Sequence, residues 1–165
     1  TPMMLAGDEF AHSQFGNNNP YCQDNVLTWI AWDAISKEDK EQVKFVRRVI
    51  GLRKKLRIFN RRHFFIGKVV KNGYKDIAWY NERGVEMAAN DWHDGNRKAL
   101  SYCVYTGSRF VLAIFNANHD DMSWKLPEIS GNLSWNLLLD SSSKFGEENR
   151  LGADNQSPGV ERVII

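Results

Sequence analysis

The sequence predicts a mainly β fold, in which a C-terminal antiparallel β-sandwich follows the last strand and helix of a larger α/β domain. Near residue 60 the spacing of apolar residues changes from a helical period of about 3.6 to the strand period of about 2. Ahead of that change there is one buried-type strand and one helix, which need parallel neighbours to complete a layer. We therefore expect residues 1–59 to end a larger α/β domain and residues 60–165 to form the β domain that follows it.

Residues 2–6 are a short apolar run without alternation, which predicts a strand buried on both faces. The chain opens directly on this run, without an initiator Met, so we expect it to have been cut from a longer polypeptide. A long polar stretch over 12–33 follows and contains Gly-Asn-Asn-Asn-Pro at 16–20, a cluster of turn formers. Loops of this length in ordered domains are usually functional.

A helix is predicted over residues 37–57. Ser36 and Asp39 have the spacing of a capping box at its start. Basic side chains crowd its second half, where they complement the helix dipole. A basic helix also allows a nucleic-acid hypothesis, but the acidic first turn and the balanced total charge argue against it. One apolar stripe runs along the helix through Phe45, Val49, Leu52 and Leu56.

The remainder of the chain reads as short strands separated by turn signals, the pattern of a small antiparallel sandwich or barrel. Asn72-Gly73 predicts a two-residue hairpin turn of the primed type. Residues 106–109 predict a second hairpin between strands of matching length. The predicted strands cover residues 64–70, 74–80, 100–105, 110–116, 122–126, 134–139 and 160–165.

The composition excludes several classes of protein. The chain has 165 residues, 42% of them hydrophobic, and 22 basic against 20 acidic side chains leave a net charge of +2. This charge gives no field for nucleic acid or anionic lipid, and no run reaches the roughly 18 apolar residues of a membrane span. Two cysteines, Cys22 and Cys103, and the lack of a signal-peptide pattern predict a reduced, cytoplasmic protein.

Common catalytic patterns are missing from the sequence. It has no phosphate-binding glycine loop, no nucleophile elbow and no His or Cys pair with zinc spacing. Residues 90–95 resemble a calcium loop only superficially, because Trp92 and Ser101 stand at ligand positions. We expect neither a metal nor a cofactor.

A group of polar side chains, residues 8–24, follows the first predicted strand. In parallel α/β domains ligands bind beyond the carboxyl ends of the strands, and this group would lie at such an end. Amides, carboxylates and an aromatic ring are groups that can bind a sugar. Alternatively, the sole role of the Asn side chains could be to cap the turns in which they lie. The candidate substrate-binding residues are Asp8, Glu9, Asn17, Asn18, Asn19, Tyr21, Gln23 and Asp24.

Two strings of residues resemble a known family. Residues 1–10 (Thr-Pro-Met-Met-Leu-Ala-Gly-Asp-Glu-Phe) and 16–25 (Gly-Asn-Asn-Asn-Pro-Tyr-Cys-Gln-Asp-Asn) closely resemble the end of the catalytic barrel in glycogen debranching enzymes, the isoamylase branch of the α-amylase superfamily. Phe-Ala-His at 10–12 departs from the Phe-Gly-Arg expected there. Downstream agreement comes from Trp29, Trp32-Asp33, Arg61-Arg62, Lys75-Asp76-Ile77-x-Trp79, Glu86-Met87 and Asp91-Trp92.

The resemblance implies that residues 2–6 are the eighth strand of a (β/α)8 barrel, residues 37–57 its eighth helix, and the rest the C-terminal β domain. The parent enzyme would hydrolyse α-1,6 branch linkages in glycogen or a related glucan with retention, using two carboxyl groups about 5 to 5.5 Å apart. In the family these acids precede the region matched here. We therefore expect no catalytic residue in this chain and no turnover by it alone, with the upstream barrel and the glucan as its partners.

Two alternatives stay open at this point. The chain could be an autonomous carbohydrate-binding module, or part of a related branching, glucanotransferase or trehalose-forming enzyme. Apolar surface left exposed by truncation could also join two copies into a homodimer. For the binding module, an aromatic platform would come from Trp79, Trp92, Trp124 or Trp135.

Overall fold

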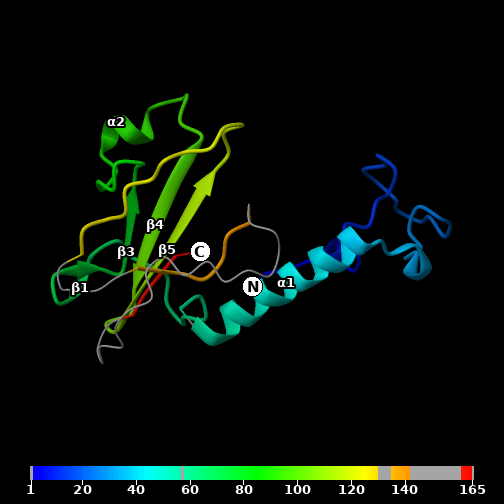
Figure 1. The fold of residues 1–165 in the computed structure, drawn as a ribbon, viewed down its shortest axis with the longest axis horizontal. Helices are drawn as coiled ribbons and strands as arrows, with labels where there is room; N and C mark the ends of the chain where they lie inside the picture. Colours follow the sequence, from blue (N-terminus) through cyan, green and yellow to red (C-terminus); the bar gives the residue numbers. More distant parts are fainter. Residues whose placement is uncertain (1, 57, 130–134, 142–160, 165) are drawn as a thin grey trace. The chain divides into compact units, whose positions relative to one another are not determined.

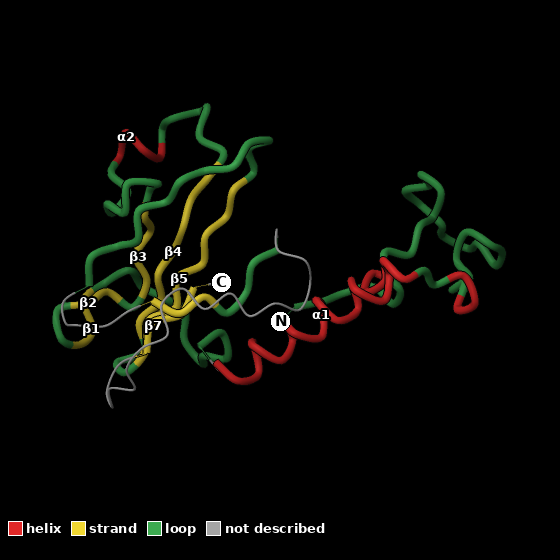
Figure 2. Tube along the Cα trace, in the orientation of Figure 1, coloured by secondary structure: helices red, strands yellow, loops and turns green. Residues whose placement is uncertain are grey.

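The secondary structure is divided between two units of the chain. The computed structural model describes residues 2–56, 58–129, 135–141 and 161–164 (Figure 1). One unit holds the described residues up to Leu56, and the other holds those from residue 58 to 140 together with the last strand. The first unit carries the long helix and the second the described strands (Figure 2). The mainly β class is thereby confirmed.

The predicted strand over residues 2–6 is not present. Residues 2–5 have no regular structure, and Met3 keeps 98% of its surface exposed. A buried-type strand needs hydrogen-bonding neighbours on both sides, and the described part of this unit contains no other strand. The chain instead turns into a short 3-10 helix, η1 (Asp8–Phe10), whose Phe10 is buried with its ring 5.5 Å from that of Trp32.

The predicted helix and its capping box are confirmed. A second 3-10 helix, η2 (Trp32–Ala34), leads into α1 (Lys37–Leu56). The Asp39 N–H donates to Ser36 Oγ at 3.1 Å, and the Ser36 N–H donates to Asp39 Oδ2 at 2.8 Å. These reciprocal bonds satisfy two N–H groups that the helix itself cannot use. The last predicted helical position, Arg57, lies outside the described residues.

The second unit is built on a mixed five-stranded sheet in the order β3-β4-β5-β7-β6 and a separate two-stranded ribbon of β1 and β2. β3, β4 and β5 pair antiparallel, whereas β7 pairs parallel to both β5 and β6. The elements are β1 (Val69–Lys71), β2 (Tyr74–Lys75), β3 (Ile77–Tyr80), α2 (Ala89–Trp92), β4 (Ala99–Tyr105), β5 (Arg109–Asn116), β6 (Trp135–Leu137) and β7 (Glu161–Ile164).

Three strand predictions differ from the structure. The strand expected over 64–70 is reduced to β1, and the sheet is not purely antiparallel because β7 runs parallel to its neighbours. Residues 122–126 form no strand. The Lys125 N–H there donates to the Glu82 carbonyl at 2.9 Å, and Leu126 packs on the core. The segment therefore lines the sheet rather than extending it, and the second layer of the expected sandwich stays a prediction.

Both hairpin predictions are confirmed. Asn72 and Gly73 have φ of 51° and 78°, the left-handed pair that a type I′ turn requires. The Asn72 side chain also donates to the Tyr105 hydroxyl at 3.1 Å, which ties the ribbon to β4. At the other hairpin the Thr106 N–H donates to the Arg109 carbonyl at 3.0 Å, and β4 passes directly into β5.

The largest buried cluster lies on one face of the β4–β5 pair, and Val104, Val111 and Ala113 are buried on the other face. Cys103 stands opposite Leu112, and Tyr105 stands opposite Phe110 with stacked rings 4.4 Å apart. Trp135 of β6 completes the buried cluster. Cys22 is exposed and Cys103 is buried, and no disulfide joins them. Partly buried side chains packed around this core are Tyr74, Tyr80, Ile114, Leu126, Ile129 and Leu137.

A buried carboxylate, Asp76, fastens the segment ahead of β1 to the sheet. It is 2% exposed and accepts the Ile66 N–H at 3.0 Å, the Gly67 N–H at 2.9 Å and Arg61 Nη1 at 3.3 Å. Burial alone would raise the pKa of Asp76, but the backbone donors and the Arg61 charge outweigh burial and lower it. The guanidinium of Arg61 also lies 4.1 Å from the centre of the Phe65 ring.

A second polar network joins the β3–α2 connection to the start of β4. Arg97 donates to Glu82 Oε2 at 2.5 Å and to Asp91 Oδ1 at 2.9 Å. Asn81 is fully buried, donates to Asp91 at 3.2 Å and accepts the Arg83 and Val85 N–H groups. The Asn81 carboxamide thereby occupies two backbone N–H groups of the turn that follows β3.

Replacing Asp76 with Asn removes the charge that three donors share. We expect Asp76→Asn to lower the free energy of unfolding by about 2 kcal/mol, the scale of hydrogen bonds to a charged group. Because the pKa of Asp76 is lower in the folded state, its stabilisation is present above the unfolded-state pKa and is lost as the pH falls through the folded one. Urea titration at pH 7 and pH 3 measures both effects.

The control is Glu86→Gln, the same change in the exposed Lys75–Glu86 pair. It should alter the free energy of unfolding by less than about 0.5 kcal/mol. Equal losses in the two variants would show that the Asp76 bonds add nothing specific to stability.

Gly84 is required by both its backbone conformation and its surroundings. Its φ is 71°, and a Cβ there would lie 2.6 Å from the Lys125 carbonyl oxygen. We expect Gly84→Ala to cost more than about 1 kcal/mol, measured as a fall in the urea midpoint. Gly95→Ala is the control, because a Cβ at Gly95 meets no atom within 4 Å. Tolerance of Gly84→Ala at the level of Gly95→Ala would contradict this packing.

Candidate functional site

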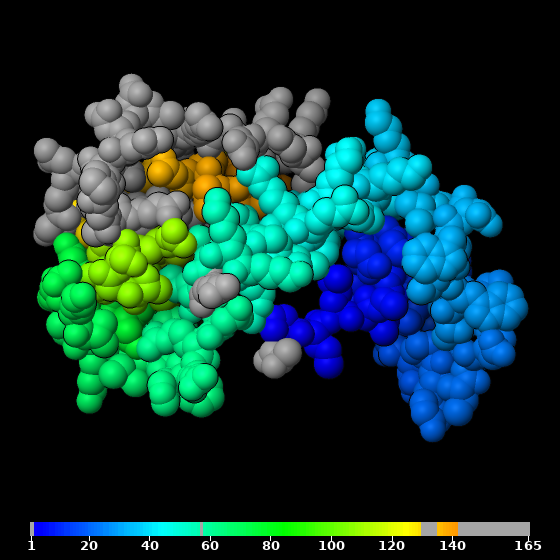
Figure 3. All heavy atoms as spheres, turned by 90° about the horizontal axis from the view of Figure 1, so that it is seen from below, coloured from blue at the N-terminus to red at the C-terminus, as the bar shows by residue number. Residues whose placement is uncertain are grey.

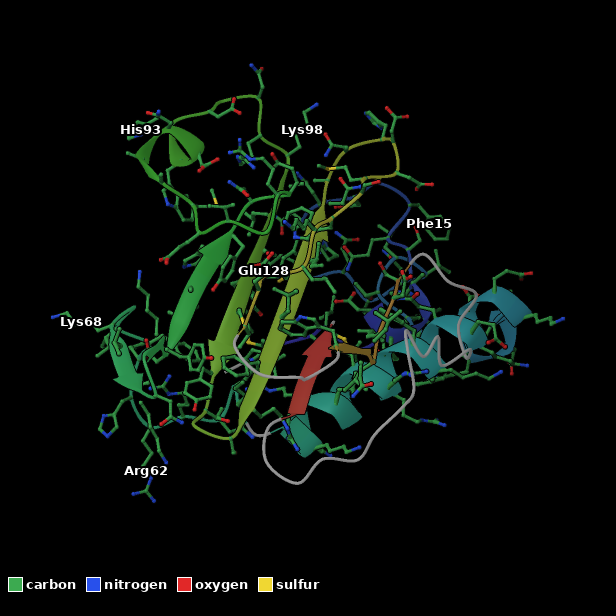
Figure 4. All side chains as sticks on the ribbon, turned by 60° about the vertical axis from the view of Figure 1, so that its left-hand side comes forward. Phe15, Arg62, Lys68, His93, Lys98 and Glu128 are labelled. Carbon is green, nitrogen blue, oxygen red and sulfur yellow. The ribbon has the colours of Figure 1, made fainter. Side chains whose placement is uncertain are left out.

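The sequence-predicted site residues lie together in the polar loop, which we define as residues 7–24 of the first unit. The loop begins at η1 and runs through the Asn-rich turns at the surface of its unit (Figure 3). Tyr21 has 81% of its surface exposed, and Phe15, labelled in Figure 4, has 75%. The loop therefore presents both polar and aromatic groups to solvent.

Asp8 and Glu9 are turned toward the backbone of their own turn. An Asp8 carboxylate oxygen accepts the Leu5 N–H at 3.2 Å, and a Glu9 carboxylate oxygen accepts the Gly7 N–H at 2.9 Å. The His12 N–H donates to the Gly7 carbonyl at 3.0 Å and closes the turn. The two acids thus fix the start of the polar loop.

The Asn-rich stretch holds itself in successive turns. Asn17 Oδ1 accepts the Asn19 N–H at 2.8 Å, and Asn19 Oδ1 accepts the Tyr21 N–H at 3.3 Å. These are the local side-chain-to-backbone bonds that the turn-capping alternative predicts. They do not remove the residues from the surface, since Asn17, Asn18 and Asn19 are all exposed. Capping and ligand contact are compatible here.

Beyond Tyr21, side chains bond to side chains. Asn25 Nδ2 donates to Gln23 Oε1 at 2.8 Å, and Trp29 Nε1 donates to Asp24 Oδ1 at 2.7 Å. Trp29 remains 57% exposed, so the bond to Asp24 orients a ring that solvent can reach. Trp29 was not among the predicted site residues. An aromatic donor five residues after an Asp in a turn-rich loop is the signal that could have found it.

The carboxyl groups with a shifted pKa lie outside the polar loop, in the second unit. A retaining glycosidase needs one carboxyl group kept protonated by a raised pKa. Elsewhere among the described residues, the carboxyl groups whose pKa departs from its ordinary value are Asp76, Glu82 and Asp91, and all three are lowered by hydrogen bonds and Arg neighbours. These groups are carboxylates at neutral pH and would not protonate a leaving group.

Within the described ranges, no group of three or more His, Cys, Asp or Glu side chains is placed to hold a metal ion. Nor does any described helix combine the length and apolar character needed to cross a bilayer.

Comparison with known proteins identifies relatives along most of the chain, although no family model matches it. It is 35% identical over 162 residues to the glycogen operon protein GlgX homolog of Mycobacterium tuberculosis, an alignment covering 89% of this chain and 22% of that protein. The GlgX homolog of Haemophilus influenzae is 35% identical over 127 residues, covering 77% of this chain and 17% of that protein.

The glycogen debranching enzyme of Serratia proteamaculans is 33% identical over 127 residues, covering 77% of this chain and 17% of that enzyme. The chain thus spans 17% to 22% of the length of these curated relatives. At 33–35% identity along most of its own length, the chain belongs to the GlgX-type glycogen debranching enzyme family.

Proposed function

We propose that this chain is the C-terminal portion of a debranching glycosidase that hydrolyses α-1,6-glucosidic branch linkages in glycogen or a related glucan. In this proposal residues 1–59 end the catalytic barrel, residues 60–165 form the β domain after it, and the polar loop lines the glucan cleft. The observation that carries the proposal is the similarity to a GlgX homolog over 89% of the chain and to a glycogen debranching enzyme over 77% of it.

The geometry of the polar loop supports contact with an uncharged, hydroxyl-rich ligand. Its turns are already fixed by the Asn17, Asn19 and Asp24 hydrogen bonds, so ordering the loop on binding costs little conformational entropy. Exposed carboxamides both donate and accept hydrogen bonds, as sugar hydroxyls require. The exposed ring of Tyr21 offers an apolar face for the C–H surface of a sugar.

We further propose that the chain does not catalyse hydrolysis by itself. The acids of the polar loop serve its own turn, and Asp76, Glu82 and Asp91 are held as carboxylates by their donors. The nucleophile and the proton donor would come from the part of the parent enzyme that this chain does not match. The second unit would then stabilise the barrel by covering apolar surface.

The test of the loop's role is Tyr21→Ala, assayed by retardation of the purified chain in native gels containing glycogen. Loss of one stacking ring should weaken binding about fivefold, equivalent to about 1 kcal/mol. Phe15→Ala is the matched control, since Phe15 is an exposed ring of the same loop outside the candidate residues. Equal retardation of Tyr21→Ala and the unaltered chain would contradict a glucan-contacting loop.

The proposal that the chain does not catalyse hydrolysis by itself is tested by a reducing-end assay on glycogen and pullulan with the chain alone. We expect no turnover, because no described carboxyl group is arranged as a proton donor. Hydrolysis that is abolished by Asp8→Asn or Glu9→Gln would show that the reacting acids lie in this loop.

A further inference from the structure

Four aromatic side chains form a continuous row across the second unit; we call Trp92, Trp79, Tyr102 and Phe115 the aromatic row. The ring centres of Trp92 and Trp79 are 5.7 Å apart, and those of Trp79 and Tyr102 are 5.4 Å apart, both edge-to-face. Tyr102 and Phe115 follow at 5.9 Å with their planes tilted by 31°. The row takes one ring from α2 and one from each of β3, β4 and β5.

Strand register places this row on the face opposite the Cys103–Leu112 cluster, next to the buried Val104–Val111 pair. Trp79 pairs directly with Tyr102, and Tyr102 pairs with Ala113, two positions before Phe115 on the same side of β5. Cys103 and Leu112 point to the other face, where the buried cluster lies. The row therefore does not belong to the buried cluster described above.

The two ends of the aromatic row are open to solvent. Trp92 and Phe115 are each 53% exposed, whereas Trp79 and Tyr102 between them are half-buried. Other exposed rings of this unit, such as Phe64, stand outside the row, whereas Trp92 and Phe115 end a series of rings in mutual contact and so form one extended aromatic surface.

The surroundings of the row suit a neutral ligand. Beside Trp92, the carboxylate of Asp91 is paired with Arg97 at 2.9 Å and with Arg83 at 3.7 Å. At the other end Phe115 is followed by Asn116, whose amide donates to the Asp120 carbonyl. Figure 4 labels His93, which directly follows α2, and Lys98, which directly precedes β4. The Asp91 carboxylate beside Trp92 is thus compensated by two arginines.

The other tryptophans suggested as a platform are placed differently. Trp135 is 8% exposed and belongs to the buried core cluster, so it is unavailable to a ligand. Trp124 is only partly exposed, and its indole N–H is buried. The structure therefore narrows the sequence-based platform to Trp79 and Trp92 and adds Tyr102 and Phe115.

We propose that the aromatic row is a glucan-binding surface separate from the polar loop, which holds a linear α-1,4-linked segment of the polymer. The choice of glucan as ligand rests on the proposed function. Sugar rings carry apolar C–H faces that pack on exposed aromatic rings, and their hydroxyls match the carboxamides and paired charges beside the row. Such a surface would keep the protein on a branched polymer while another site acts on it.

The first experiment compares retardation in glycogen-containing native gels for Trp92→Ala, Phe115→Ala and the double variant. We expect the double variant to bind about tenfold more weakly than the unaltered chain. Phe64→Ala is the matched control, since Phe64 is a 94% exposed ring of the same unit outside the row. Unchanged retardation of a folded double variant, judged by its circular dichroism and melting temperature, overturns the proposal.

A second measurement needs no variant. Oxidation of Trp92 by N-bromosuccinimide is followed by peptide mass spectrometry with and without maltoheptaose. We expect maltoheptaose to slow oxidation of Trp92 several-fold, equivalent to about 1 kcal/mol of protection, and to leave the exposed Met3 unprotected from peroxide in a parallel reaction. Equal oxidation rates with and without maltoheptaose overturn the proposal.

The two proposals can fail independently. Weaker binding by the row variants with normal binding by Tyr21→Ala supports the row and contradicts the loop. Weaker binding by Tyr21→Ala alone supports the loop and overturns the row.

Discussion

The pairing of β4 with β5 is the constraint on which the second unit depends. Its register decides which side chains enter the core and which form the aromatic row, because neighbours along a strand point to opposite faces. A slip of one residue in β4 and β5 would turn Tyr102 and Phe115 to the face now held by Cys103 and Leu112, and would break the Tyr105–Phe110 pairing in the core. The tight hairpin at 106–109 prevents that slip by joining the strands through a fixed turn.

Outside the strands, side-chain oxygens replace the hydrogen bonds that a sheet would supply. Asp76 accepts two N–H groups ahead of β1, and Asn81 accepts two more after β3. In the polar loop Asn17 and Asn19 do the same. Buried irregular backbone is stable only where such acceptors are present, because a buried N–H without a hydrogen-bond partner raises the free energy of the folded state. The same devices that stabilise the loops leave their outer surfaces polar and fixed.

Local signals in the sequence were sufficient to predict local structure. The capping box at Ser36 and Asp39 and the turn at Asn72-Gly73 act within a few residues, and both are confirmed. Such local signals could not predict features that depend on residues distant in the sequence. The strand predicted over residues 2–6 does not form, because the described part of its unit offers no strand to pair with. The parallel pairing of β7 depends on β5, which lies far away in the chain.

The candidate site shows the same division. Turn chemistry in the polar loop could be predicted because each Asn acts on a residue two positions away. The role of Trp29 needed the structure, since only folding brings its indole N–H to Asp24. The aromatic row needed it too. Its members come from separate strands and a short helix, and no sequence spacing shows that Trp79 and Phe115 lie in one line.

The central claim is our proposal that the polar loop and the aromatic row are two glucan-contacting surfaces of one chain. The direct measurement is a two-dimensional ¹H–¹⁵N NMR titration of the isotopically labelled chain with maltoheptaose. The account predicts saturable shifts at the amides of residues 17–24 and at the indole N–H groups of Trp79 and Trp92, with little change at Cys103 and Leu112. A spectrum that stays unchanged at millimolar maltoheptaose would contradict it.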